Sequence, residues 1–482
     1  MQEQEHERKG GHVALLASPG MGHLIPLLEL GKRLVKYHAL QVTVFVVTTD
    51  TSISQSQLIQ RSEIPHLLNI VVLPPVANSS PVDPAATVVE KIIVTMKESL
   101  AALRSAISEM KLRPTALIVD LFGTEAMAIA DEFEMLKYAF IASNALFLAA
   151  TMYATVIDQK ELDEHVKQQQ PLKIPGCPPI RFEDTLESFR NLDDPISAGF
   201  SNVGIEMSNA DGILVNTWED LESTTLRALK DANTLRPIVK APVYPIGPLV
   251  RPGERSILRN KVLDWLDMQP TESVIYVSFG SGGTISSEQM IELAWGLETS
   301  QQRFIWVVRP PMENEVCEFY LTAGHGPDGT PDYLPDGFLT RNAKMGLVVP
   351  NWAPQAEILP HPSVGGFLTH CGWNSALESI ANGVPMIAWP LYAEQKMNAA
   401  MLTEELQVAL RSKVLPSTGV VKREEIGMMI RRIVVDKEGD EMRRKVKVLK
   451  RSAEKVYSKG GSSYNALSQV ANRVRSRPKY TN

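Results

Sequence analysis

Cysteine is scarce in this chain, with three residues in a length of 482. Cys177, Cys317 and Cys371 are widely spaced, which argues against a disulfide framework and fits a reducing compartment. The Cys and His spacing typical of zinc sites is also missing, and no suitable loop holds a carboxylate-x-carboxylate cluster. We therefore expect neither structural disulfides nor a bound metal.

The chain also lacks a strong excess of charge of one sign, and it lacks the common nucleotide-binding fingerprints. The net charge of −6 provides no basic surface for nucleic acid or anionic membrane. The P-loop pattern G-x-x-x-x-G-K-[ST] is absent, and Gly280, Gly282 and Gly283 do not match G-x-G-x-x-G. A P-loop enzyme and a dehydrogenase are therefore disfavoured.

One uncharged run of mostly apolar residues, Tyr138–Ile157, is long enough to span a bilayer. Ser143 and Asn144 interrupt it with an N-cap pattern, which predicts a strand followed by a buried helix. The first residues, MQEQEHERKGG, are dense in charge, and the last, SRPKYTN, are not apolar. We therefore expect no signal peptide, no membrane anchor and a soluble cytoplasmic monomer.

The composition, 44% hydrophobic and 22% charged, is that of a globular α/β protein, and the length suits two domains. Strand and helix patterns alternate as far as Val243–Val250, and the following RPGERSILRN has linker composition. This predicts a first domain at 1–248, a linker at 249–260, a second domain at 261–459 and a helical segment at 460–482. Lys160–Pro179 and Pro310–Pro335 have the composition of long loops that line or cover a site.

The most informative segment lies between residues 352 and 395. SVGGFLTH (Ser363–His370) has the apolar pattern of a buried parallel strand, and after CGWNS a helical pattern, SALESIAN, ends at Gly383. The backbone N–H groups of Trp373, Asn374 and Ser375 are therefore expected at a helix N-terminus, with His370 as a further donor. Orphan N–H donors and the helix dipole make such a position an anion site, here a diphosphate pocket.

A second segment, Ser273–Met290, has the pattern of a strand, a glycine-rich turn and a helix start. Small residues in such a turn let the backbone approach a phosphate, although a tight turn alone also needs them. Ser281 is the expected hydrogen-bond donor to the diphosphate.

A His and an Asp are predicted to meet near the N-terminus. His12–Gly20 is a compact apolar strand followed by a helix with Pro26 in its first turn, so His23 lies at their junction. Asp120 ends another apolar run. The carboxyl ends of parallel strands share one edge of a sheet, where open α/β folds bind ligands. The pair has the residue types of a general base and its orienting partner, although a strand-end His is more often structural.

The segment from Trp352 to Gln395 resembles, along its whole length, the signature box of plant UDP-dependent glycosyltransferases. The N-terminal PGMGHLIP and the C-terminal third are similar to the same family, and to its group that glucosylates hydroquinone, monolignols and related phenolics. The resemblance implies the GT-B fold, an α/β class with two facing Rossmann-like doubly wound domains and a cleft between them. It also implies that the last helix, within 460–482, packs back on the N-terminal domain.

The family's binding residues map onto this chain as follows. Trp352, with Ala353, is the platform for uracil, although a lone Trp is more often core, and Gln355 approaches uracil or ribose. Glu378 accepts the ribose hydroxyls; its alternative role is a capping box with Ser375. Glu394 and Gln395 hold the sugar hydroxyls, with Gln typical of glucose and Glu standing where many members have Asp. Ser143 stands where the family has a Thr in the sugar pocket.

The resemblance makes His23 the catalytic base and Asp120 its charge partner. The implied reaction is a metal-free, inverting transfer of glucose from UDP-glucose to a hydroxyl of a small phenolic metabolite. Three alternatives remain open: another UDP-sugar donor, an epimerase of UDP-sugars, and a UDP-sugar binder without turnover.

Overall fold

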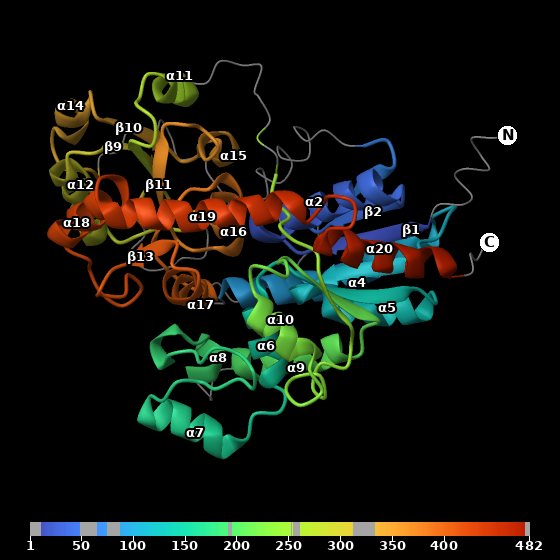
Figure 1. Ribbon diagram of the computed structural model, residues 1–482. Helices are drawn as coiled ribbons and strands as arrows, with labels where there is room; N and C mark the ends of the chain where they lie inside the picture. The colour runs from blue at the N-terminus through green and yellow to red at the C-terminus, as the bar shows by residue number, and fades with distance from the viewer. Residues whose placement is uncertain are drawn as a thin grey trace. The chain divides into compact units, whose positions relative to one another are not determined.

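The structure, a computed structural model, describes residues 11–48, 65–74, 87–190, 195–251, 253, 261–311 and 333–477. Most of the predicted linker at 249–260 and of the predicted loop Pro310–Pro335 lies outside the described residues. The chain divides into two compact units. Unit 1 comprises Met1–Leu249 with Lys455–Asn482, and unit 2 comprises Val250–Glu454. Figure 1 labels many of their helices and strands.

Unit 1 is built on a seven-stranded sheet of order β3-β2-β1-β4-β5-β6-β7, in which all neighbouring strands are parallel. The order reverses between β1 and β4, so the sheet is doubly wound. Its strands are β1 His12–Ala17, β2 Gln41–Val46, β3 Leu68–Val72, β4 Ala116–Asp120, β5 Leu136–Ile141, β6 Gly212–Val215 and β7 Val243–Pro245.

Helices lie in the connections between these strands that the structure describes, as parallel pairing requires. The helices described in unit 1 are α2 Met21–His38, α4 Val88–Ser108, η1 Leu121–Ala126, α5 Met127–Glu132, α6 Ala145–Tyr153, α7 Gln159–Gln168, η2 Phe182–Asp184, α8 Glu187–Arg190, α9 Pro195–Ser208, α10 Ser223–Lys230 and α20 Ser462–Ser476.

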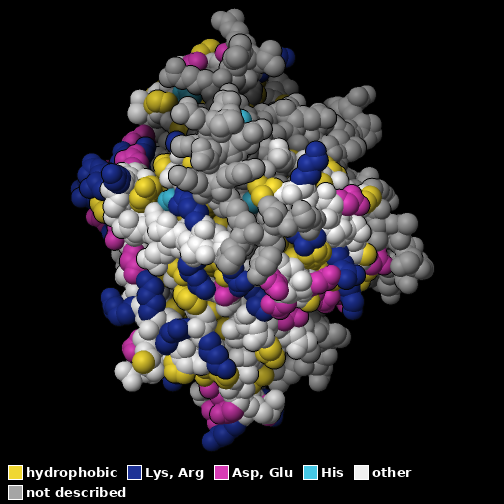
Figure 2. Space-filling model, turned by 90° about the vertical axis from the view of Figure 1, so that its right-hand side faces the viewer, with side chains coloured by type: hydrophobic (Ala, Val, Ile, Leu, Met, Phe, Trp, Pro, Cys, Tyr) yellow, Lys and Arg dark blue, Asp and Glu magenta, His cyan; other side chains and the backbone are white. Residues whose placement is uncertain are grey.

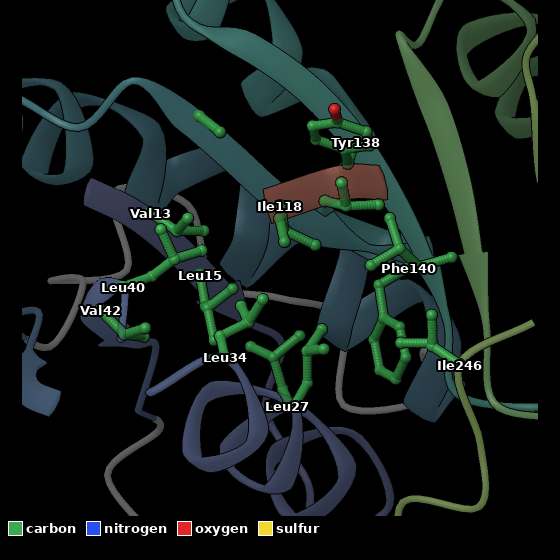
Figure 3. Packing of buried hydrophobic residues seen from close by; sticks show 14 of the residues in the cluster. Val13, Leu15, Leu27, Leu34, Leu40, Val42, Ile118, Tyr138, Phe140 and Ile246 are labelled. Atoms are coloured by element: carbon green, nitrogen blue, oxygen red, sulfur yellow. The ribbon is translucent and has the colours of Figure 1, made fainter. Parts of the chain in front are cut away.

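The core of unit 1 lies between its sheet and helices. All six residues of β1 are buried, which explains why this strand has a continuous apolar pattern. Leu27 and Leu34 of α2 pack in the same cluster as Leu15 of β1 (Figure 3). Leu467 and Val470 of α20 belong to this cluster too, so the C-terminal helix is part of unit 1.

The uncharged run of residues 138–157 forms a strand and a buried helix, as predicted. β5 takes its first part, and Asn144 caps α6 by accepting a hydrogen bond from the N–H of Phe147. Every residue of α6 is buried.

Among the helices of the described ranges, none is long and apolar enough to cross a membrane. Basic and acidic side chains are interspersed over the face shown in Figure 2.

Unit 2 is built on a six-stranded parallel sheet of order β10-β9-β8-β11-β12-β13. Its order reverses between β8 and β11, so this sheet is doubly wound as well. Its strands are β8 Val274–Ser278, β9 Arg303–Val308, β10 Gly346–Pro350, β11 Val364–Thr369, β12 Met386–Ala388 and β13 Ala409–Arg411.

The helices of unit 2 pack their apolar side chains on this sheet, around Phe304, Trp306 and Trp389. Those described are α11 Lys261–Asp267, α12 Ser287–Ser300, α14 Phe338–Asn342, α15 Gln355–Ile358, α16 Trp373–Asn382, α17 Gln395–Ala400, the π-helical turn η3 Met401–Glu405, α18 Arg423–Val434 and α19 Lys437–Lys455.

Two predicted details of unit 1 are wrong. Helix α2 begins at Met21, directly after Gly20 with its φ of 106°, so Pro26 lies in the second turn instead of the first. The predicted loop Lys160–Pro179 contains most of helix α7. Asp158 starts that helix by accepting a hydrogen bond from the N–H of Glu161, a cap that outweighs the polar composition of the segment.

Candidate functional site

Within unit 2 the predicted donor-site residues gather where the strand order reverses. The carboxyl ends of β8 and β11 are neighbours, because Ser278 pairs with Thr369. Gly280 and Ser281 follow β8, whereas His370 and the start of α16 follow β11. Ligands of open parallel sheets bind in the crevice outside such neighbouring carboxyl ends.

The start of helix α16 has the features of an anion site. The helix begins at Trp373, and its N-cap residue is Gly372, which has no side chain to cap the first turn. The preceding residue, Cys371, is held in the left-handed region with a φ of 64°. Asn398 of α17 donates to the Cys371 carbonyl at 2.9 Å, and the N–H of Cys371 donates to Thr369 Oγ1 at 3.3 Å. These contacts fix the turn at Cys371 and so orient the N-terminus of α16.

The Cys371 thiol is not a reactive group of this site. It is fully buried, and burial raises its pKa to about 12. The role of Asn398 was missed from the sequence. Its position three residues after Gln395 indicates only that both lie on one helix, not that its amide reaches another loop.

His370 is enclosed by two glycines. A Cβ atom on Gly280 would lie 2.4 Å from His370 Cε1, and one on Gly372 would lie 2.4 Å from Nε2, so only glycine fits at either position. Burial, with the charge of Arg309, lowers the pKa of His370 to about 4. The imidazole is therefore neutral at pH 7. A neutral imidazole donates one hydrogen bond, which suits an anion at the helix start.

Gln355, Ser375 and Glu378 form one hydrogen-bond network. Gln355 Nε2 donates to Ser375 Oγ at 3.0 Å and to Glu378 Oε2 at 2.7 Å. The alternative of a capping box is wrong, because the N-cap is Gly372 and Ser375 already lies inside the helix. Glu378 is buried, and its carboxylate faces the segment that carries Trp352 through Gln355.

Trp352 is not a core residue, since its side chain is 57% exposed. It follows β10 through Asn351, which has a φ of 60°, and its N–H donates to the Pro350 carbonyl at 2.7 Å. Ala353, the next residue, is buried. A rigid turn therefore presents the indole to solvent, a geometry suited to stacking with a planar base.

Gln395 has a structural task in addition to the predicted contact with sugar. Its Oε1 accepts hydrogen bonds from the N–H groups of Leu391 at 2.9 Å and Tyr392 at 3.2 Å, so it holds the loop between β12 and α17. Burial raises the pKa of Tyr392 to about 12, although a hydrogen bond with Gln395 opposes the shift. Glu394 is the half-buried N-cap residue of α17.

The glycine turn after β8 is separate from the start of its helix. The N–H of Gly283 donates to the Phe279 carbonyl at 3.1 Å, which closes the turn around the half-buried Ser281. Helix α12 begins later, at Ser287, and Ser286 caps it. A small cavity of about 10 Å³, room for about one water molecule, lies against this turn and is also lined by Arg309.

The predicted pair in unit 1 lies where its strand order reverses, between β1 and β4. His23 is the third residue of α2, and Asp120 is the last residue of β4. His23 Nδ1 lies 3.3 Å from Asp120 Oδ2, an ion-pair distance without the alignment of a hydrogen bond. Phe122 packs edge-on against the imidazole at 5.2 Å between ring centroids.

Asp120 is fully buried and held by donors from two segments. Ser18 donates to it through both its N–H, at 3.0 Å, and its hydroxyl, and the N–H of Phe122 donates at 3.1 Å. These contacts leave Oδ2 facing His23 Nδ1. Sequence reasoning missed Ser18, although its place one residue after β1 was a signal.

Ser143 lies at the same sheet edge, two residues after β5, which pairs with β4. It is buried next to the start of α6, where Glu222 accepts hydrogen bonds from the N–H groups of Ala145 and Leu146. That carboxylate occupies the helix start, so α6 offers no second anion site.

In the part of the chain that the structure describes, no group of three or more His, Cys, Asp or Glu side chains is placed to hold a metal ion.

Comparison with known proteins agrees with this geometry. The family model described as UDP-glucoronosyl and UDP-glucosyl transferase matches residues 241–426. Anthocyanidin 3-O-glucosyltransferase 5 from Manihot esculenta is 54% identical over 461 residues, which cover 96% of this chain and 95% of that protein. Hydroquinone glucosyltransferase from Rauvolfia serpentina is 44% identical, with 95% and 97% covered.

The crystal structure of TcCGT1 in complex with UDP superposes with a TM-score of 0.90 at 48% identity, and covers 96% of this chain and 99% of that one. The two parallel doubly wound sheets are thus those of the GT-B class. The chain belongs to the plant UDP-glycosyltransferase family (glycosyltransferase family 1), and it is a glycosyltransferase.

Proposed function

We propose that the protein transfers glucose from UDP-glucose to a hydroxyl of a small phenolic plant metabolite and inverts the anomeric configuration. The observation that carries this proposal is the contact of His23 with the buried Asp120 at the reversal point of the unit 1 sheet. The names of the related anthocyanidin and hydroquinone glucosyltransferases support glucose as the sugar and a phenolic acceptor.

Asp120 faces Nδ1, so the Nδ1–H tautomer of His23 leaves the lone pair on Nε2. Nε2 accepts the proton of the acceptor hydroxyl as its oxygen attacks the anomeric carbon of the donor. The bond from that carbon to the diphosphate oxygen breaks, and UDP leaves with the electron pair. One displacement gives a β-glucoside from an α-linked donor.

Unit 2 supplies the donor side of this reaction. Trp352 stacks on uracil, Glu378 accepts the ribose hydroxyls, and Gln355, which donates to Glu378, approaches the uracil or ribose. The growing charge on the leaving diphosphate is stabilised by the first-turn N–H groups of α16 and by His370. Preorganised donors of this kind stabilise charge without reorganisation.

Transfer to phenolics is tested by incubating the purified protein with UDP-glucose and a panel of monolignols, coumarins, hydroquinones and flavonoids, read by mass spectrometry. The anomeric coupling constant of the product should show a β-glucoside. An α-glucoside would exclude a single displacement. Conversion of UDP-glucose to another UDP-sugar, without any glycoside, would show the epimerase alternative instead.

A second candidate is the same transfer from another UDP-sugar, because the loop already uses much of the hydrogen-bonding capacity of Gln395. Its Oε1 accepts from the Leu391 and Tyr392 amides and its side chain bonds that of Tyr392, so its amide nitrogen is the group left to contact the sugar. Gln395→Glu keeps a side-chain oxygen for those amides and removes the NH₂ donor. We expect it to weaken UDP-glucose binding about tenfold while UDP binding and the melting temperature stay near wild type.

Gln395→Ala, the matched control, removes the loop contacts as well and should weaken both ligands. Calorimetry with UDP and UDP-glucose separates the two roles. If Gln395→Glu loses UDP and UDP-glucose equally, this residue holds only the loop, and sugar choice lies elsewhere.

A further inference from the structure

Arg309 is a buried cation next to the donor site of unit 2. It follows β9 directly, its residue is 8% exposed, and its Nε donates to the Asn351 carbonyl at 3.2 Å. Among the residues that the structure describes, no carboxylate forms an ion pair with it. A buried guanidinium without a negative partner is costly, because the charge loses its hydration.

Nearby phenols do not supply the missing negative charge. Tyr392 and Tyr276 interact electrostatically with Arg309, yet burial raises the pKa of both phenols, in Tyr392 to about 12. Both hydroxyls are therefore neutral at pH 7. Burial lowers the pKa of Arg309 itself, but a guanidinium remains protonated in proteins.

The position of Arg309 connects it to the anion site. β9, β8 and β11 are consecutive in the sheet, so Arg309, Gly280 and His370 follow neighbouring carboxyl ends. Gly280 contacts the His370 imidazole and lines a cavity with Arg309. Since His370 is neutral, Arg309 adds a positive charge to the dipole of α16 at this end of the sheet. Arg411, at the end of β13, is also cationic, but it lies 4.0 Å from the carboxylate of Glu404.

We propose that Arg309 is a positioning residue that offsets the diphosphate charge of the donor from behind His370 and the Gly280 turn, and so favours a nucleoside diphosphate over the bare nucleoside. This inference rests on the proposed donor site. Charges attract strongly across a low-dielectric interior, so the guanidinium acts without touching the phosphate. The diphosphate in turn provides a negative charge that no described residue offers Arg309 as an ion-pair partner.

The test compares UDP and uridine binding by calorimetry for the wild type, Arg309→Gln and Arg309→Lys. We expect Arg309→Gln to weaken UDP about 10- to 100-fold and uridine by less than about threefold. Arg309→Lys retains the charge and should keep most of the preference for UDP.

The matched control is Arg443→Gln, in the same unit. Arg443 is equally buried but bonds Asp440 and the Gly365 and Ile433 carbonyls. Its loss should lower the melting temperature and leave the ratio of UDP to uridine affinity unchanged.

Two results would overturn the inference. If Arg309→Gln weakens UDP and uridine by the same factor, Arg309 only braces the Asn351 carbonyl and the turn that carries Trp352. If Arg309→Lys loses as much UDP affinity as Arg309→Gln, charge is not its contribution. A wild-type protein that binds UDP no better than uridine would instead refute the proposed diphosphate site, before any variant is compared.

Discussion

Replacing His23 by alanine is expected to lower turnover by about 10²–10⁴, the usual worth of general-base catalysis, with UDP-glucose affinity nearly unchanged. The physical reason is that, in the proposed mechanism, His23 Nε2 takes up the proton of the acceptor hydroxyl during the transfer step, whereas the proposed contacts with UDP-glucose lie in unit 2. Steady-state kinetics with a phenol, together with calorimetry of UDP-glucose, measures both quantities.

Acceptor acidity provides the control for this variant. A thiol or a strongly acidic phenol arrives already ionised and needs no base, so it should recover much of the activity that His23→Ala loses with an alcohol. A loss of equal size across acceptors of every acidity would return His23 to a structural role.

Asp120→Asn is expected to act through the same imidazole. Asp120 Oδ2 faces His23 Nδ1, so the double variant should be little slower than His23→Ala alone. Asp120 also accepts from Ser18 and Phe122, and the melting temperature must therefore be measured beside the rate. Additive losses in the double variant would separate the two residues into independent roles.

Trp352→Ala carries the second large expected effect, a loss of about 1–3 kcal/mol in UDP affinity, the usual worth of base–aromatic stacking. The indole is 57% exposed, so its removal should barely change the melting temperature. Uridine should lose affinity by the same factor as UDP, because the contact is with the base. Calorimetry with both ligands measures this.

Trp352→Phe is the matched control, since it keeps an aromatic face and should retain most of the affinity. The pattern also distinguishes this residue from Arg309, whose removal should affect UDP and spare uridine. If Trp352→Ala loses UDP affinity but leaves uridine affinity intact, the indole does not stack on uracil.

Much of the fold was readable from local pattern. Continuous apolar runs predicted parallel strands at β1, β8 and β11, because strands buried on both faces carry apolar residues at every position. The N-cap at Asn144 separated β5 from α6 for a similarly local reason. The start of α2 was predicted less accurately than that of α16, since Gly20, which turns the chain, begins α2 without a capping side chain.

The sequence by itself determined which residue types follow each strand: His23 after β1, Asp120 at the end of β4, Gly280 after β8 and His370 after β11. Such placement depends on strand order along the chain, which apolar periodicity reveals. Only the tertiary structure decided which of these groups touch. The enclosure of His370 by two glycines, the Ser18 bonds to Asp120 and the burial of Arg309 all join residues of different segments or depend on desolvation. Contact and desolvation arise from packing in three dimensions, and spacing along one chain does not encode them.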